Sequence, residues 1–185
     1  MEDNKEKKLT KSFFVVAFIV YCFIGWCYEV IWEAAIGHGF VNRGFLFGPY
    51  LPIYGFGVLT LYFMLRKLMK KEIKIGKVNV TPVITFLAIL VIASTIEYFS
   101  SYVMELLFHK RWWDYSSDLI NLNGRISLRN SSILAAGAMV LLYGVQPLLE
   151  KLIPKINEKV LKVIAIIIVA VVSIDFIVTI AGYLM

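Results

Sequence analysis

Four carboxylates lie inside long apolar segments of this chain, where charged side chains are uncommon. Glu29 and Glu33 are four residues apart in the first segment, so they share one face of a helix. Glu97 and Asp175 lie in later segments. An ionised side chain at the centre of a bilayer costs on the order of 3 kcal/mol or more, so such residues usually face the protein interior or a wet cavity. They could bind a substrate or an ion, or take part in acid–base catalysis.

Some of these polar residues also have a simpler interpretation. Glu33 could mark the end of its helix at the outer interface, and Asp175 could form a hydrogen bond with a neighbouring helix. His38 and His109 lie in linkers beside the apolar segments, and no second histidine or cysteine supplies metal-ligand spacing. We therefore predict no metal site, and the sequence indicates no particular cofactor.

A short loop, WWDYSSDLINLNGR at residues 112–125, contains a high density of hydrogen-bonding groups. Arg125 in this loop and Arg43 in the first linker are natural counter-ions for the acids, because a guanidinium can bind a carboxylate through two parallel hydrogen bonds. The tryptophans could equally be interfacial residues without a further role. We expect the loop and the intramembrane acids to converge on one polar site.

The stretch NRGFLFGPYLPIYGFG, residues 42–57, contains glycines and the prolines Pro49 and Pro52. Proline is tolerated in the first turn of a helix, but further along it removes a backbone hydrogen bond. We predict an interrupted or re-entrant segment near residues 44–57 that lines a cavity, with Tyr50 and Tyr54 in its wall. Tight helix packing is the alternative interpretation.

Composition indicates how these residues are positioned. The chain has 185 residues, of which 59% are hydrophobic and 17% are charged, and the apolar residues occur in blocks of about twenty, the length that spans a bilayer. We predict an all-α, polytopic membrane helix bundle that forms a single integral membrane domain over residues 1–185. The five transmembrane helices are expected at about residues 12–36, 46–66, 82–108, 129–150 and 161–184.

The basic residues predict the orientation of these spans. Fourteen of the nineteen lysines and arginines lie in the N-terminal tail, around residues 66–77 and around residues 151–162, which five spans place on one side. The positive-inside rule assigns that side to the cytoplasm. The N-terminal tail, residues 1–11, is then cytoplasmic, and loop 112–125 and the C-terminus are extracytoplasmic. At about 1.5 Å per residue, Glu29 and Glu97 lie roughly 22–25 Å from the cytoplasmic ends of their helices, in the outer half.

Four sequence blocks, GWCYEVIW, NRGFLFGPYLPIYGFG, EYFSSYVMELLF and RWWDYSSDLINLNGRISL, occur in this order. In these blocks the chain resembles the CmpB-like bacterial membrane proteins, the Putative ABC-transporter type IV family. The resemblance runs from about residue 13 to residue 145, and the family name implies a permease. One departure is Leu119–Ile120, where a proline and a phenylalanine are common in the family. The positions that match the family pattern are Gly25, Glu29, Asn42, Arg43, Gly44, Gly48, Pro49, Pro52, Tyr54, Gly55, Glu97, Trp113, Asp114, Tyr115, Ser116, Asn121, Asn123, Gly124 and Arg125.

Residue chemistry, orientation and resemblance together define a candidate substrate-binding or functional site. Its members are Glu29, Asn42, Arg43, Tyr54, Glu97, Trp113, Asp114, Tyr115, Asn121, Asn123 and Arg125. We interpret the protein as a permease-type or transporter-type subunit of the cell membrane, with an outward-facing polar site and no named substrate. One alternative is a membrane-embedded enzyme that acts on lipid or lipid-linked substrates at the outer leaflet, and another is a non-catalytic binding or immunity protein.

The sequence also limits the partners. Five spans form a small bundle, so we expect a homodimer or a partner membrane subunit in addition to the lipid bilayer. The chain has no GxxxxGK[ST] motif, so an ATPase would be a separate protein. The basic residues cluster at the ends of apolar segments, which is typical of topology signals and does not indicate nucleic-acid binding. The sequence indicates neither a particular energy source nor a particular enzymatic activity.

Overall fold

The computed structural model describes residues 9–109, 111 and 113–184 of the chain. Most of these residues are helical, and four segments are long and apolar enough to cross a membrane: Lys11–Ala35, Thr81–Leu107, Leu128–Lys155 and Glu158–Gly182. Each segment begins within three residues of the first residue of a predicted span. The all-α membrane helix bundle predicted from the sequence is confirmed. Most of the predicted N-terminal tail, residues 1–8, lies outside the described residues.

The second predicted span differs from the helix in the structure. Helix α2 is Pro52–Met69, 18 residues long, and begins six residues later than predicted. Residues 36–51 are irregular, so the predicted interruption covers residues 44–51, whereas residues 52–57 are the first turns of α2. Pro52 suits this first position because its φ is fixed near the helical value and it needs no amide hydrogen bond. Helix α2 is not among the four segments that are long and apolar enough to cross a membrane.

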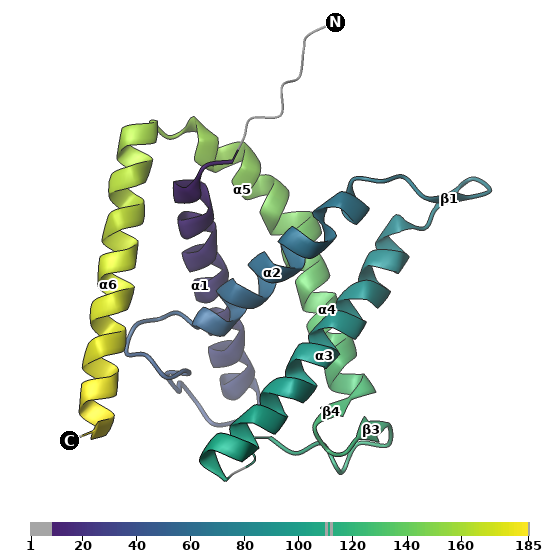
Figure 1. The fold of residues 1–185 in the computed structure, drawn as a ribbon, viewed down its shortest axis with the longest axis horizontal. Helices are drawn as coiled ribbons and strands as arrows, with labels where there is room; N and C mark the ends of the chain where they lie inside the picture. The colour runs from purple at the N-terminus through teal and green to yellow at the C-terminus, as the bar shows by residue number, and fades with distance from the viewer. Residues whose placement is uncertain (1–8, 110, 112, 185) are drawn as a thin grey trace, which may run out of the picture. The chain divides into compact units, whose positions relative to one another are not determined.

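The chain divides into two compact units, which we call unit 1 (residues 1–59 and 145–185) and unit 2 (residues 60–144). In unit 1, helices α1 (Lys11–Ala35) and α6 (Glu158–Leu184) pack side by side (Figure 1). Helix α5 (Gln146–Leu152) and the 3₁₀ turn Ile153–Lys155 precede α6.

Close packing in unit 1 depends on two glycines. A Cβ atom at Gly55 would lie 2.6 Å from the sulfur of Cys22, and one at Gly25 would lie 2.2 Å from Cγ of Tyr54. Both distances are far shorter than a van der Waals contact. The absent side chains therefore allow the start of α2 to approach α1, and this approach positions Tyr54.

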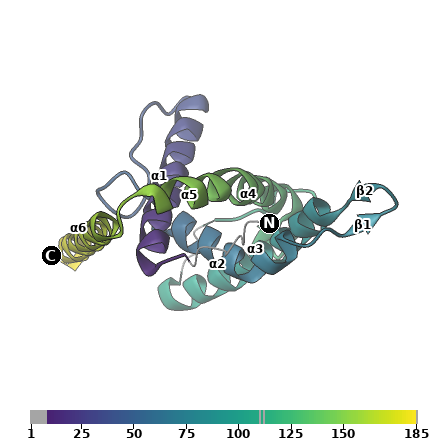
Figure 2. The ribbon, with the colours of Figure 1, turned by 90° about the horizontal axis from the view of Figure 1, so that it is seen from above.

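Unit 2 is built around α3 (Thr81–Phe108) and α4 (Leu128–Val140), which pack against each other (Figure 1). A hairpin of β1 (Lys74–Ile75) and β2 (Val78–Asn79) joins α2 to α3 and extends beyond their ends (Figure 2). A second hairpin, β3 (Asn121–Leu122) and β4 (Ile126–Ser127), pairs Asn121 with Ser127 and Leu122 with Ile126. It lies where α3 ends and α4 begins (Figure 1).

The start and end of α4 have local causes. Ser127 is the N-cap residue, and its hydroxyl accepts a hydrogen bond from the amide of Asn130 at 3.1 Å. The helix continues into a π-helical turn at Leu141–Val145, which ends two residues before Pro147. Proline has no amide to donate to the preceding turn, and a π turn is one way for a helix to accommodate such a defect.

Candidate functional site

The structure brings loop 113–125 onto the intramembrane acid of α3. Oε1 of Glu97 accepts hydrogen bonds from the hydroxyl of Tyr115 and from Nδ2 of Asn130, both at 3.1 Å. Glu97 is sixteen residues after Thr81, about 24 Å along α3. Its other carboxylate oxygen, Oε2, is buried and has no hydrogen-bond partner among the described residues. A helix, a loop and the start of α4 therefore meet at one carboxylate.

The loop holds Tyr115 in place through its own backbone. The amide of Tyr115 donates to the carbonyl of Gly124 at 2.7 Å, and the indole nitrogen of Trp113 donates to the carbonyl of Arg125 at 3.0 Å. Gly124 has φ +67°, and a Cβ atom there would lie 2.4 Å from both Oδ1 of Asp114 and Oγ of Ser116. Position 124 therefore requires glycine for conformation and for space.

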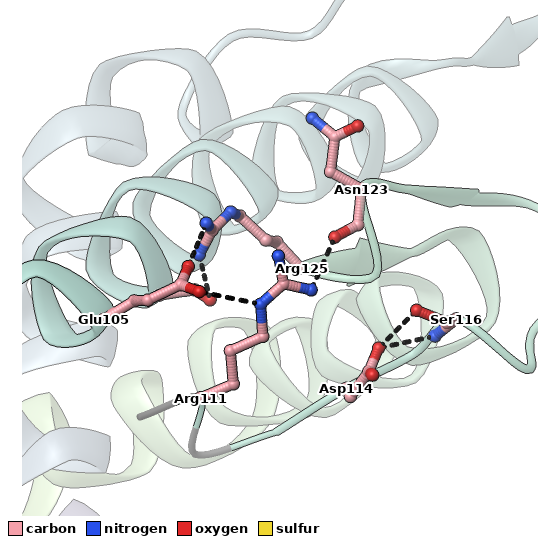
Figure 3. Close-up of polar contacts among 7 residues, drawn as sticks. Glu105, Arg111, Asp114, Ser116, Asn123 and Arg125 are labelled. Carbon is pink, nitrogen blue, oxygen red and sulfur yellow. Dashed lines mark hydrogen bonds and ion pairs between the residues drawn. The ribbon is translucent and has the colours of Figure 1, made fainter. Parts of the chain in front are cut away.

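Asp114 organises the neighbouring turn. Its Oδ1 accepts hydrogen bonds from the amide of Ser116 at 2.9 Å and from the hydroxyl of Ser116, as Figure 3 shows. These bonds, with the charge of Arg111 as a weaker cause, lower the pKa of the Asp114 carboxyl below its ordinary value. Asp114 is therefore an ionised acceptor at neutral pH, and its described partners are loop residues.

Arg125 is a buried cation of unit 2. Its guanidinium forms an ion pair with Glu105, donates to the hydroxyl of Ser101 at 3.1 Å and lies 5.2 Å from the ring centroid of Tyr102. Arg111 binds the other oxygen of Glu105 at 3.2 Å and donates to the carbonyl of Asn123 at 3.3 Å. Figure 3 shows Glu105 between the two guanidinium groups. Arg125 is thus a counter-ion, as predicted, and Glu105 is the carboxylate that it binds.

The two asparagines of the β3–β4 hairpin shape its turn. Oδ1 of Asn121 accepts the amide of Gly124 at 3.0 Å, and Nδ2 of Asn121 donates to the carbonyl of Asp118 at 2.8 Å. Asn123 has φ +55°, a left-handed conformation that asparagine tolerates better than most residues. Its Nδ2 donates to the hydroxyl of Tyr98 on α3 at 3.0 Å. The hydrogen bond between Asn123 and Tyr98 attaches the hairpin to α3.

A second polar cluster lies in unit 1. The hydroxyl of Tyr54 donates to Oε1 of Glu29 at 2.7 Å, and Nε of Arg43 lies 3.7 Å from carboxylate oxygens of both Glu29 and Glu33. His38 is 2.7 Å from the other oxygen of Glu33. The predicted role of Arg43 as a counter-ion agrees with this geometry, because one guanidinium lies beside two acids of the same helix face.

Asn42 connects the irregular segment to α1. Its Oδ1 accepts the indole N–H of Trp26 at 2.7 Å, and its Nδ2 donates to the carbonyl of Phe47 at 3.3 Å. Asn42 therefore fixes residues 42–47 from the α1 side.

Asp175 of α6 fixes the same irregular segment from the other side. Its carboxylate accepts the amides of Phe47 at 3.1 Å and Gly48 at 2.9 Å, together with the hydroxyls of Tyr50 and Thr179. Gly48 has no room for a side chain, since a Cβ atom would lie 2.2 Å from the ring of Tyr50. Asp175 thus satisfies backbone donors of a non-helical segment, which explains an acidic residue in so apolar a helix.

The sequence matches the family described as Putative ABC-transporter type IV over residues 16–180. The match covers most of the chain. The protein belongs to this family. No curated protein and no solved structure gives a significant match. For a Putative ABC-transporter type IV protein, the four apolar helical segments are consistent with a membrane location.

In this Putative ABC-transporter type IV protein, the predicted site residues form two groups within the two units. Unit 1 contains Glu29, Asn42, Arg43 and Tyr54. Unit 2 contains Glu97, Trp113, Asp114, Tyr115, Asn121, Asn123 and Arg125. Convergence of both groups on one site stays a prediction.

Sequence reasoning missed several partners of these residues. Asn130 was not a candidate, although it is a polar residue in the first turn of an apolar segment and follows the N-cap serine by three residues. Ser101 and Tyr102 were missed because hydroxyls and aromatic rings are common in membrane helices and give no distinct pattern.

The chemistry available to the clusters is acid–base exchange and polar recognition. Among the described residues, no group of three or more histidines, cysteines, aspartates or glutamates has the spacing of a metal site. Glu97 offers a buried carboxylate oxygen, whereas the oxygens of Glu29 and Glu105 contact cations or donors. Glu97 is therefore a described carboxylate with a buried oxygen that accepts no hydrogen bond from the described residues.

Proposed function

We propose that this protein is a permease-type subunit of a cell-membrane transporter and that the Glu97 cluster contributes to its solute pathway. The observation that supports this most directly is the contact of an extramembrane loop, through Tyr115, with an acid inside a membrane helix. Intramembrane acids commonly belong to ion or substrate pathways. The family description supports the same class of protein.

We further propose that both clusters belong to the outward half of the protein. Helix α2, with 18 residues, is about 27 Å long, close to the roughly 30 Å of a bilayer core. If α2 crosses, five spans keep the three basic regions on the cytoplasmic side, as the positive-inside rule requires. Loop 113–125 and the C-terminus are then extracytoplasmic.

A topology experiment tests this orientation. Cys22 and Cys27 are replaced, and single cysteines are introduced as Ser117→Cys and Lys74→Cys, both at exposed positions. Intact cells are then treated with a thiol reagent that does not cross membranes. Labelling at position 117 but not at 74 supports the outward orientation. Labelling at 74 alone would invert the protein and would place the hairpin β1–β2 outside.

A second experiment tests the transport role. Cells that lack the gene are compared with cells that express the wild-type chain, Glu97→Ala, or the exposed control Glu158→Gln, in a defined medium. We expect wild-type and control cells to change the level of at least one solute in the medium, and Glu97→Ala cells to resemble the deletion strain. A change confined to extracted lipids would favour an enzyme at the outer leaflet, and no change in either fraction would contradict both functions.

The small size of the bundle suggests that a second copy or another membrane subunit completes the pathway, and a separate ATPase would supply energy for an ABC-type mechanism. Cross-linking in native membranes followed by mass spectrometry of the purified complex identifies such partners. An ATPase in the complex would support the ABC-type mechanism, whereas recovery of this chain alone would oppose it.

A further inference from the structure

We propose that Glu97 is a proton-binding residue that exchanges its proton with the aqueous phase from inside the α3–α4 helix pair. This deepens the proposed function, because proton exchange at a membrane-embedded acid is a means of driving or gating transport. Only the use of this proton to drive or gate transport rests on the proposed function. Proton binding by Glu97 can be measured on the purified protein without any transport.

The hydrogen bonds of Glu97 are arranged unequally on its two oxygens. Oε1 accepts from both Tyr115 and Asn130, whereas Oε2 is buried without a partner among the described residues. In an ionised carboxylate both oxygens are acceptors and both carry charge, but in a carboxylic acid one oxygen accepts and the other is a hydroxyl. A buried neutral hydroxyl without a partner costs less than a buried charged oxygen without one, so the observed arrangement fits a carboxylic acid with the proton on Oε2.

The charges around Glu97 point to the same state. Among the described residues, the arginines of unit 2 that face this end of α3 are engaged elsewhere: Arg125 and Arg111 both bind Glu105. Arg129 of α4 is exposed. The described groups that donate hydrogen bonds to Glu97 are the neutral hydroxyl of Tyr115 and the amide of Asn130. Glu97 is partly exposed, but its Oε2 is buried. Negative charge on a buried oxygen without a cation or donor is costly, and a proton removes that cost.

Proton release is chemically balanced without any further reagent. The O–H bond at Oε2 breaks, its electron pair remains on the carboxylate, and the proton passes to water. The two donors on Oε1 then stabilise the negative charge that has formed. Tyr115 is a loop residue, so the loop is in direct contact with the exchanging group.

The same helix pair contains one more buried atom of this kind. Ser131, 2% exposed and next to Asn130 in the chain, has a hydroxyl without a partner among the described residues. Each of these two oxygens is unusual, because buried polar atoms are normally hydrogen-bonded.

Infrared difference spectroscopy of the full-length purified protein tests the proposal directly. Spectra at neutral and alkaline pH are subtracted, and the carbonyl stretch of a protonated carboxylic acid is followed. We expect this band at neutral pH in the wild type and in Glu158→Gln, whose carboxylate is an exposed surface group. The band should be lost in Glu97→Gln. Its absence from the wild type, or its persistence in Glu97→Gln, overturns the proposal.

A second variant keeps the test informative if Glu97→Gln does not fold. Tyr115→Phe removes one of the two donors on Oε1 and leaves the carboxyl group in place. A carbonyl that loses a hydrogen bond vibrates at a higher frequency, so the band should shift upward but remain. An unshifted band contradicts the assignment to Glu97.

The bound species is distinguished by repeating the spectra with sodium replaced by choline. A proton site gives the same band in both media. A carboxylate band that depends on sodium in the wild type, but not in Glu97→Gln, would identify a sodium site and would overturn the proton proposal. A normal proton band together with unchanged solute levels in the deletion experiment would reject the transport function and leave the proton site standing.

Discussion

Glu29 and Glu97 are two intramembrane carboxylates with the same kind of first partner and different second partners. Each accepts a hydrogen bond from a tyrosine further along the chain, Tyr54 at 2.7 Å and Tyr115 at 3.1 Å. Glu29 also has a guanidinium, Arg43, at 3.7 Å, whereas Glu97 has the neutral amide of Asn130. The tyrosine fixes the position of each acid, and the second partner decides whether its charge is balanced.

This difference separates the two units chemically. In unit 1 the described acids contact donors or cations, and Asp175 accepts two backbone amides. In unit 2 both described loop arginines bind Glu105, and Glu97 has neutral partners. The comparison suggests that the acids of unit 1 stabilise the fold, while Glu97 is available for exchange. Four comparisons of variants test this interpretation, from the largest expected effect to the smallest.

Arg125→Ala should have the largest effect on stability. The Arg125 side chain is 8% exposed, packs on Tyr102 and donates to buried Ser101. Its removal takes a donor from the buried Ser101 hydroxyl and leaves Glu105 with Arg111 as its described cation. We expect a loss of about 3 kcal/mol in the free energy of unfolding, measured in detergent. The control is Arg111→Ala, whose side chain is 39% exposed and should contribute little. Equal losses would contradict the assignment of Arg125 as the structural cation of unit 2.

Gly25→Ala should have the next largest effect, because a methyl group there overlaps the ring of Tyr54. Overpacking of this kind costs about 2 kcal/mol and would also displace the hydroxyl that binds Glu29. Thermal unfolding measures the loss, and Tyr54 fluorescence in a background with fewer tyrosines follows the displacement. Gly57→Ala, where no described atom lies within 4 Å, is the matched control and should be neutral or slightly stabilising. A neutral Gly25→Ala would show that Tyr54 is not held against α1.

Asp175→Asn should loosen the irregular segment without unfolding unit 1. An amide cannot accept on both of its terminal atoms, so at least one charge-assisted hydrogen bond to Phe47 or Gly48 is lost. At about 1.5 kcal/mol for such a bond, amide exchange at these residues should accelerate by roughly tenfold. Thr179→Val, which removes only a donor from the same helix, should leave the exchange nearly unchanged. Unchanged exchange in Asp175→Asn would mean that the carboxylate does not hold the segment.

The smallest effects provide the sharpest comparison between the two acids. Glu29→Gln keeps an acceptor for Tyr54 but removes the charge beside Arg43, and the partly exposed pair predicts a loss of about 0.5–1 kcal/mol. Glu97→Gln keeps an acceptor for Tyr115 and Asn130 and, if Glu97 is protonated, changes no charge. We therefore expect a change within about 0.5 kcal/mol at neutral pH. A larger loss in Glu97→Gln than in Glu29→Gln would show that the ionised acid with a stabilised charge is Glu97 of unit 2, and would contradict this interpretation.

The amino-acid sequence by itself determined the class of the fold and identified many of the polar residues that form the two clusters. Apolar runs of bilayer length predict helices, because every backbone amide must be satisfied within the segment in hydrocarbon. Arg43 as a counter-ion of α1 acids and the interruption after Gly44 also followed from residue types. Such features depend on local spacing, which a sequence displays directly.

Only the tertiary structure decided which groups meet. That Arg125 binds Glu105 rather than Glu97, that Asn130 completes the Glu97 cluster, and that Asp175 binds the amides of residues 47 and 48 depend on contacts between distant segments. The start of α2 at Pro52 likewise depends on those contacts, because Asp175 stabilises a non-helical backbone that hydropathy alone would place in a helix. Hydrogen bonds between segments require positions within about 3 Å, and residue spacing along one chain does not specify them.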